Sequence, residues 1–444
     1  MWAKAQSIEE IHRAMDAYDY EMPIAQIAPA SGDTLFTPLR AKALRAMNRY
    51  PEALKEWNSL LQADSTNTKI LIELAECYKL VGRTSEATPC YEKAVALHPE
   101  NTYFRQQHIR TLLATENYEQ ARNACHAWLD RDSLSATAFK LMGMAYEGMV
   151  SDNPDALTNA FMSYKASYRI DSLDAQTVAH IASIFNNNEQ FQDAVDVTEK
   201  YRLTDTLNID VNRQNAKAYC LLKEYPTAIN RYESLKGMGD KSFTTLYYLG
   251  ISHYGDNWMY GAYDNLLLAH KKSPMDVNVL YYLGKSAART SWKKEGVGYI
   301  QEAIEISTPT DSLMSRLYDG LVECYRYVNA PYEKIEAMKK LYSYNKKYTL
   351  FYHIAYTYDR QKDYANAVHY YEKYMALVPK DKQLALDDEG KPKPNVETLY
   401  QIAKRRVEKI KAEDFFRNGV HDDYFEPKML NALKAKKDSL DKTK

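Results

Sequence analysis

Residues 68–101, TKILIELAECYKLVGRTSEATPCYEKAVALHPEN, contain the pattern that decides the fold. Ala87 in this stretch lies 34 residues after Ala53 and 34 residues before Ala121. After a five-residue insertion, the interval of 34 resumes with small residues at Ala160, Ala194, Ala228, Ala262 and Gly296. From Gly296 to Ala367 is 71 residues, which is two intervals with three extra residues. A period of this length, sustained over most of the chain, predicts a tandem array of helical repeats.

Two further columns run in parallel with these alanines. One holds small residues, with Ile109 as a departure: Ala41, Ala75, Gly143, Ala182, Ala216, Gly250, Gly284, Gly320 and Ala355. The other, four residues after the first column, is bulky: Trp57, Tyr91, Tyr164, Tyr232, Leu266, Ile300 and Tyr371. Small residues let two antiparallel helices approach closely, and the bulky residue one turn later fills the gap between neighbouring repeats.

A fourth column marks the end of each repeat. It holds proline at Pro99, Pro274 and Pro379, which stops the second helix. Elsewhere the slot holds Ser or Thr preceded by Asp, as at Ser65, Ser133, Ser172 and Thr206. These residues are expected to supply caps near the start of the next helix.

The columns together resemble the tetratricopeptide repeat, a helix-turn-helix unit of about 34 residues. Residues 68–101 match its pattern at Leu71, Leu74-Ala75, Tyr78, Ala87, Tyr91, Ala94 and Pro99. Residues 348–381 match at Phe351, Ile354-Ala355, Tyr358, Ala367, Tyr371 and Pro379, with Tyr374 in place of the second alanine. Ten units are expected, and the unit at 313–347 fits worst because Tyr332 falls where alanine is expected. The resemblance implies an all-α, right-handed superhelical solenoid of antiparallel helix pairs.

The expected organisation places ten repeats at residues 34–381 between capping segments. Residues 1–33 form an N-terminal region in which Ser7 and Glu10 make a capping box, and Pro23 fits the first turn of a second short helix. A polar loop at 382–394 precedes a C-terminal capping helix at 395–416 and a charged tail at 417–444. Such caps cover the apolar faces that the ends of an array would expose.

Composition excludes several classes of function. The 58 Lys and Arg residues balance 59 Asp and Glu residues, so the chain lacks the basic excess that non-specific nucleic-acid binding requires. No apolar run approaches the length of a transmembrane helix, so no membrane span is expected. The 5 cysteines are scattered and odd in number, which argues against a disulfide framework and a cysteine zinc site.

The N-terminus suggests export. Ala3-Lys4-Ala5 before Gln6 matches a small-x-small signal-peptidase site, which makes residues 1–5 the expected remnant of a signal peptide. This reading gives an exported, periplasmic location. The alternative is a chance match, in which case a cytoplasmic location is expected.

No motif for catalysis or metal binding emerges. Gly284-Lys285-Ser286 matches the end of a phosphate-binding loop, but the glycine required five positions earlier is Val279. His421-Asp422-Asp423 reads as a solvated acidic turn because further ligands are missing nearby in sequence. The sequence therefore predicts no catalytic residue, no metal, no cofactor and no small-molecule ligand.

The resemblance implies that the first helix of each unit lines a concave groove. The residues at the corresponding positions are expected to contact a partner: Arg213, Lys217, Tyr247, Tyr281, Lys285, Arg289, Tyr352, Tyr356 and Arg360. Tyr and Arg are frequent contact residues at interfaces, and this set suits a peptide with acidic groups. The alternative is packing, since 38 tyrosines must place some rings at these positions by abundance alone.

The leading hypothesis is a non-enzymatic scaffold or adaptor that binds protein or peptide segments in the concave groove, in the cell envelope if the chain is exported. One alternative is an extracytoplasmic carbohydrate-binding or uptake protein, whose tyrosine rings stack on sugars. A second alternative is the regulatory arm of an enzyme complex. Exposure of the tyrosine row separates the first two, and a deep polar pocket with converging carboxylates or histidines would favour an enzyme.

Overall fold

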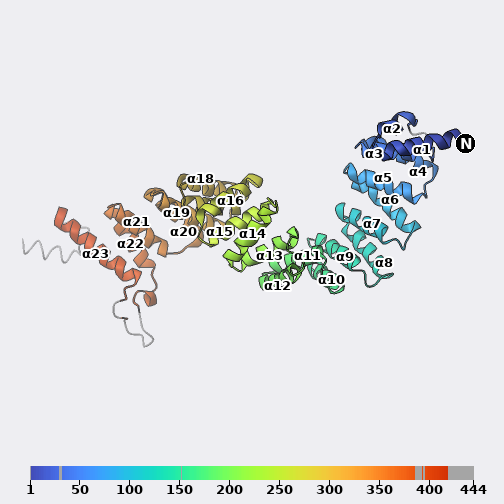
Figure 1. Cartoon of the computed structure of the whole chain (residues 1–444). Coiled ribbons are helices and arrows are strands. Elements are labelled where there is room, and N and C mark those ends of the chain that lie inside the picture. The colour runs from blue at the N-terminus through green and yellow to red at the C-terminus, as the bar shows by residue number, and fades with distance from the viewer. Residues whose placement is uncertain (1, 30–32, 152, 386–392, 394–395, 419–444) are drawn as a thin grey trace, which may run out of the picture. The chain divides into compact units, whose positions relative to one another are not determined.

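The computed structural model describes residues 2–29, 33–151, 153–385, 393 and 396–418, and all regular secondary structure in these ranges is helical (Figure 1). The chain divides into two compact units, Met1–Leu222 and Lys223–Lys444. From α3 to α22, helices follow one another as helix-turn-helix pairs. The all-α, paired-helix fold predicted from the sequence is confirmed. The first helix of each pair has an odd-numbered label, from α3 to α21, and the second helix has an even-numbered label, from α4 to α22.

The first unit contains two N-terminal helices, five complete pairs and the first helix of a sixth. Its helices are α1 (Trp2–Asp16), α2 (Glu21–Gln26), α3 (Thr37–Ala46), α4 (Tyr50–Ala63), α5 (Thr68–Leu80), α6 (Thr84–Leu97), α7 (Thr102–Ala114), α8 (Tyr118–Leu129), α9 (Ala136–Gly148), α10 (Ala156–Ile170), α11 (Ala175–Asn187), α12 (Phe191–Arg202) and α13 (Ile209–Leu221).

The second unit begins with the second helix of the sixth pair and ends in a longer helix. Its helices are α14 (Tyr225–Gly237), α15 (Phe243–Gly255), α16 (Met259–Lys272), α17 (Val277–Ala288), α18 (Lys293–Ile306), α19 (Asp311–Tyr327), α20 (Pro331–Asn345), α21 (Thr349–Arg360), α22 (Tyr364–Leu377), the 3₁₀ turn η1 (Lys380–Lys382) and α23 (Leu399–Asn418).

The turn inside most pairs has a left-handed residue just after the first helix. Eight of the ten turns contain one among the described residues: Asn48, Gly82, Glu116, Glu189, Lys223, Asn257, Asn329 and Lys362. The turns close with a bond across six residues, such as Arg49 N–H to the Leu44 carbonyl at 2.8 Å. This is the Schellman geometry that ends a helix, and here asparagine and charged residues adopt it more often than glycine.

The caps of the first helices lie two residues later than the sequence pattern predicts. Asn67, rather than Ser65, accepts the Ile70 N–H and caps α5. The preceding Asp64 has a different role, because its Oδ1 accepts the Thr66 N–H at 3.0 Å and closes the loop. The same division holds at Asp171, which accepts from Leu173 N–H, and Asp174, which caps α11. The Asp-Ser pair therefore stabilises the loop between repeats, and the residue that caps the next helix comes two residues after the Ser.

The small-residue columns lie where paired helices approach closely. The alanines of the first column are fully buried, as are those of the second column. A Cβ added to Gly284 would come within 2.8 Å of the Gly296 carbonyl oxygen, and one added to Gly296 within 2.6 Å of the Gly284 carbonyl oxygen. In α17 and α18 the two backbones are thus too close for any side chain between them.

The pair α19–α20 departs from the predicted register. In eight of the other nine second helices the fourth residue is Ala or Gly, and in α10 it is the fifth. The fourth residue of α20 is Lys334, and the Leu-small pair of the first helix is Leu321-Val322. Gly320, assigned to the small column from sequence, faces another pair, since its added Cβ would meet the Tyr281 ring at 2.8 Å. The extra residues of this repeat therefore lie before Leu321, and the predicted alignment is two residues off.

The flanking helices pack on the ends of their own units. Ile11 of α1 and Ile27, just after α2, are buried against Leu39 of α3. Helix α1 begins at Trp2, so Ser7 is inside the helix and is not its cap. Val407 and Ile410 of α23 are buried in the cluster that contains Phe351 of α21. The expected start of this helix at residue 395 and most of the tail from 417 lie outside the described residues.

We expect Ala194→Trp to lower the free energy of unfolding by at least the roughly 1–3 kcal/mol typical of overpacking. Ala194 is fully buried with Ala182 and Ala218, which leaves no space for an indole ring. Urea unfolding followed by circular dichroism measures the effect. Asp193→Trp, at the exposed neighbouring position, is the matched control and should unfold close to the wild type. Equal midpoints for both variants would contradict the packing described for this helix.

Candidate functional site

The surface formed by the first helices is polar and is joined by side-chain bridges. We call this the first-helix surface, and a bridge is a side-chain hydrogen bond or ion pair between consecutive first helices or the residues that flank them. In the first unit the bridges include Arg45 to Glu73, Lys79 to Gln107 (3.1 Å), Lys140 to Asp174 (3.1 Å) and Lys217 to Asn187 (3.1 Å). In the second unit they are Arg289 to Asn257 (2.5 Å), Lys285 to Glu323 (2.9 Å) and Arg316 to Asn278 (2.6 Å).

Tyr281 and Lys285 lie together in the second unit, but Tyr281 is buried. Its side chain is 7% exposed, and the Arg316 guanidinium lies 4.9 Å from the ring centroid. The Lys285 ammonium lies 5.3 Å from the same centroid and forms the ion pair with Glu323. Cations over an aromatic face stabilise such a cluster. Tyr281 is therefore a packing residue that lies against two of the bridging cations. Its prediction as an exposed contact residue is wrong.

Lys285 is held by the protein itself. Burial lowers the pKa of Lys285, but the hydrogen bonds from its ammonium to Glu323 and Tyr254 outweigh burial and raise the pKa well above the usual value. The side chain is therefore charged and already satisfied. A partner would have to compete with Glu323 for it.

Tyr247 and Arg289 also have internal partners. Tyr247 stacks on Phe243 with ring centroids 5.7 Å apart, and burial raises the pKa of its hydroxyl. Arg289 donates to Asn257 in the bridge between α15 and α17. Both side chains are half-buried, so only part of each is accessible to a partner.

The three predicted residues of α21 differ in exposure. Tyr352 packs edge-on against Tyr371 and Tyr374 of α22, with centroids 5.6 and 5.5 Å away. Asp359, two turns further, accepts two hydrogen bonds from Arg406 of α23, each at 2.7 Å. Tyr356 is 48% exposed, and Arg360 at the end of the helix is also exposed. These two are the predicted contact residues that remain available on α21.

Arg213 and Lys217 belong to the first unit, whereas the other seven predicted residues belong to the second. Arg213 forms an ion pair with Asp210 at 2.9 Å, and Lys217 donates to Asn187. Burial lowers the pKa of Lys217. The predicted residues are therefore divided between the two units.

A charged cavity of about 570 Å³ opens between α19 and α21 in the second unit. Arg326 and Glu323 of α19, Lys334 of α20 and His353 of α21 contribute its polar lining. Its apolar lining includes Val322, Met338, Leu341 and Leu350. Sequence reasoning missed this cavity because the repeat was aligned two residues out of register. Tyr332, and not Lys334, was therefore assigned to the position of the small residue.

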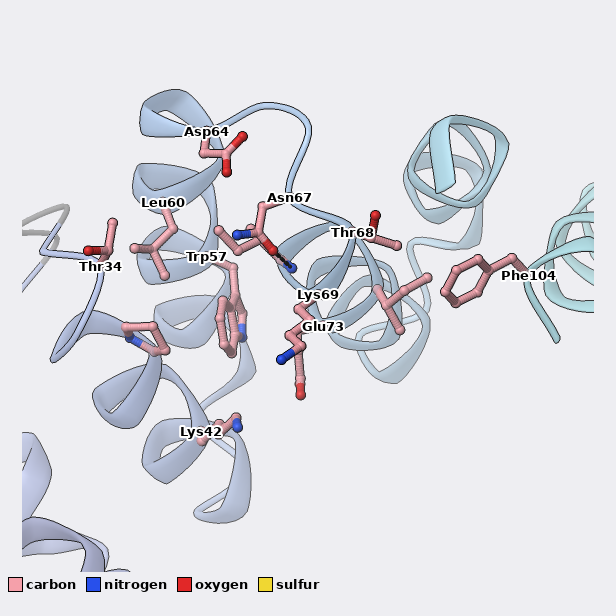
Figure 2. Close-up of a pocket in the computed structure, with 13 residues that line it drawn as sticks. Thr34, Lys42, Trp57, Leu60, Asp64, Asn67, Thr68, Lys69, Glu73 and Phe104 are labelled. Atoms are coloured by element: carbon pink, nitrogen blue, oxygen red, sulfur yellow. Dashed lines mark hydrogen bonds between the residues drawn. The ribbon is translucent and has the colours of Figure 1, made fainter. Parts of the chain in front are cut away.

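A second cavity, of about 500 Å³, lies between α3 and α5 in the first unit (Figure 2). Trp57 and Leu60 of α4 line it together with Ile70 of α5, and the charged groups at its edge include Lys42 and Glu73. Like the first cavity, it opens between consecutive first helices with the intervening second helix in its lining. The residue that could have indicated this cavity in the sequence is Trp57, but the repeat pattern assigned it to the bulky column as a packing residue.

The part of the chain that the structure describes contains no group of three or more His, Cys, Asp or Glu residues that could hold a metal ion. All five cysteines are buried, and burial raises the pKa of Cys125 to about 12 and of Cys324 likewise. Gly284-Lys285-Ser286 lies within α17, where the Ser286 hydroxyl donates to the Tyr282 carbonyl. His421-Asp422-Asp423 lies outside the described residues.

No described helix combines the length and apolar character needed to cross a bilayer.

Comparison with protein families identifies the repeats. Residues 31–128 match the N-terminal tetratricopeptide-repeat region of Psidin, and residues 348–381 match the tetratricopeptide repeat itself. Among curated proteins, 172 residues are 24% identical to the probable UDP-N-acetylglucosamine–peptide N-acetylglucosaminyltransferase SPINDLY of Hordeum vulgare. This match covers 37% of the chain and only 18% of that relative's length.

Solved structures show distant likeness. The human IFIT1 dimer with PPP-AAAA matches with a TM-score of 0.40 and 13% identity, over 80% of this chain and 92% of that one. Yeast Tom70 matches with a TM-score of 0.34 and 12% identity, over 93% and 96% of the two chains. YrrB, described as a TPR protein with an unusual peptide-binding site, matches with a TM-score of 0.37 and 14% identity, over 45% and 97%.

We expect Tyr281→Ala to lower the free energy of unfolding by about 3–5 kcal/mol, as loss of a buried aromatic ring does. Tyr356→Ala, at an exposed position on α21, should change it by no more than about 0.5 kcal/mol. Urea unfolding of both variants beside the wild type measures the difference. Similar, small effects at both positions would show that Tyr281 is outside the core.

Proposed function

Because the chain belongs to the tetratricopeptide repeat family, we propose that it is a non-enzymatic scaffold that binds segments of partner proteins on its first-helix surface. The observation that carries this proposal is the pair of cavities between consecutive first helices, at α3–α5 and at α19–α21. Each combines apolar side chains with charged groups at its edge, and concave sites of this composition suit the side chains of a bound segment.

The bridges support the same proposal. The ion pair of Arg45 with Glu73 fixes α3 relative to α5, so the cavity between these two helices is largely preformed. A preformed site loses less conformational entropy on binding than a flexible one. The scaffold therefore presents rigid positions at which an extended or helical partner segment can dock.

The tyrosine arrangement favours protein partners over sugars. Stacking on a sugar needs an open ring face, but Arg316 covers Tyr281 and Phe243 stacks on Tyr247. Tyr352 is enclosed by two further rings. The carbohydrate alternative is therefore not retained for these residues.

The second alternative, an arm of an enzyme complex, rests on the partial similarity to SPINDLY. The matched stretch is a small part of that protein, so we take from it only that this chain can serve as the non-catalytic part of an assembly. Purification of the native assembly, with identification of its subunits by mass spectrometry, tests this. An enzyme subunit in constant ratio to the chain supports it, and purification of the chain without one contradicts it.

An exported, periplasmic location is a separate proposal that rests on Ala3-Lys4-Ala5 before Gln6 alone. Sequencing of the N-terminus of the protein from its native source tests it. A terminus at Gln6 supports export, whereas a terminus at Met1 or Trp2 contradicts cleavage at this site.

We expect a variant with four exposed first-helix side chains removed to lose its partner. The alanine substitutions are at Lys42, Lys69, Tyr356 and Arg360. The matched control removes three lysines and one tyrosine from exposed positions on second helices, at Lys55, Lys93, Tyr260 and Lys271. Affinity capture from the native organism, quantified by mass spectrometry, compares both with the wild type.

The expected result is a protein captured by the wild type and the control but reduced several-fold with the first-helix variant, because contact residues there include charged anchors. Circular dichroism confirms that all three are folded. Equal capture by both variants would contradict a first-helix binding surface.

A further inference from the structure

Lys334 occupies a position that the fold otherwise reserves for the smallest residues. It is the fourth residue of α20, where the other second helices in the same register have alanine or glycine. The equivalent Ala228, Ala262 and Ala367 are fully buried. A lysine is not enclosed in that way: Lys334 is half-buried and is one of the residues that line the cavity between α19 and α21.

The same place lacks a bridge. In the second unit, α15 is bridged to α17, α17 to α19, and α21 to α23 through Asp359 and Arg406. Between α19 and α21 the described residues form no hydrogen bond or ion pair. The cavity therefore lies where the series of polar bridges is interrupted.

The cations of this cavity have no carboxylate partner among the described residues. Arg326 contacts the Tyr327 ring and hydroxyl, and Lys334 and Lys347 have no side-chain hydrogen bond or ion pair there. Of the two carboxylates in the lining, Glu323 is paired with Lys285, which leaves Asp319 against three cations. The cavity thus has an excess of positive charge.

The pKa shifts agree with this charge distribution. Burial, together with the nearby Arg326, lowers the pKa of Lys334. Burial and the charge of Lys334 lower the pKa of His353 on the opposite helix. Burial is the larger cause of both shifts, and the positive charges of Arg326 and Lys334 add to it, so an anion in the cavity would favour the charged forms of both groups.

We propose that the cavity between α19 and α21 binds the carboxylate of an acidic residue in a partner segment, through Lys334 and Arg326. The inference rests on the proposed scaffold function and specifies its partner chemistry. Met338, Leu341 and Leu350 give the cavity an apolar floor that the methylene groups and neighbours of a glutamate can contact, whereas a bare anion would leave this floor unused. The bound carboxylate replaces the acceptor that the bridged first helices of the second unit supply to each other.

Fluorescence anisotropy with the full chain tests the proposal. The probe is a labelled hexapeptide, Glu-Glu-Leu-Glu-Glu-Leu, and the control probe replaces every Glu with Gln. The variant Lys334→Ala restores the residue type that the column normally holds, so it should fold. Lys340→Ala removes an exposed lysine on the same helix but outside this cavity and is the matched control.

We expect the wild type to bind the Glu peptide in preference to the Gln peptide. Lys334→Ala should weaken the binding about tenfold, as loss of a charge-assisted hydrogen bond does, and Lys340→Ala should match the wild type. Equal binding by Lys334→Ala, or equal binding of the two peptides, would overturn the proposal. So would calorimetric binding of inorganic phosphate without binding of the Glu peptide, which would assign the cavity to a free anion.

Absence of any binding of the Glu peptide would overturn the acidic-segment proposal and leave the scaffold function to be decided by the capture experiment. None of the variants in that experiment changes Lys334 or Arg326. The two proposals can therefore fail independently.

Discussion

The close approach of paired helices at the small-residue columns is the constraint on which the rest of the structure depends. Between Gly284 and Gly296 the backbones leave no room even for a methyl group. Elsewhere buried alanines occupy the same positions, and a bulky side chain one turn later fills the space beside them. This contact sets how each second helix lies under its first helix, and hence where consecutive first helices meet. The polar bridges and the cavities are consequences of that spacing.

Pair α19–α20 shows what happens when the constraint is relaxed. Val322 and Lys334 replace two small residues, and a cavity lined by both opens beside them. Burying part of a lysine is unfavourable, and the lowered pKa of Lys334 reflects this. A position that sacrifices local stability in an otherwise regular array is a natural place for recognition, because binding can restore the missing interaction. The acidic-residue site that we propose therefore derives from this departure.

The regular part of this arrangement could be predicted from the sequence, because the need for small residues at a fixed interval leaves a visible period. The details that depend on neighbouring repeats could not. Gly320 looks like a member of the small column, but it faces Tyr281 of another pair, so the register around Lys334 was missed. Tyr281 matched a groove position, yet Arg316, 35 residues later, covers its ring. The cap at Asn67 was assigned to Ser65 because both residue types can cap, and only the loop geometry separates them.

The central claim is that Lys334 is present for recognition and not for folding. Urea unfolding of wild-type protein and Lys334→Ala, at the same pH and ionic strength, tests this most directly. Alanine fits the contact and removes a partly buried charge, so the account predicts a free energy of unfolding equal to or above that of the wild type. A decrease of more than about 1 kcal/mol, the usual effect of removing a stabilising interaction, would contradict it, because Lys334 would then be holding the helix pair together.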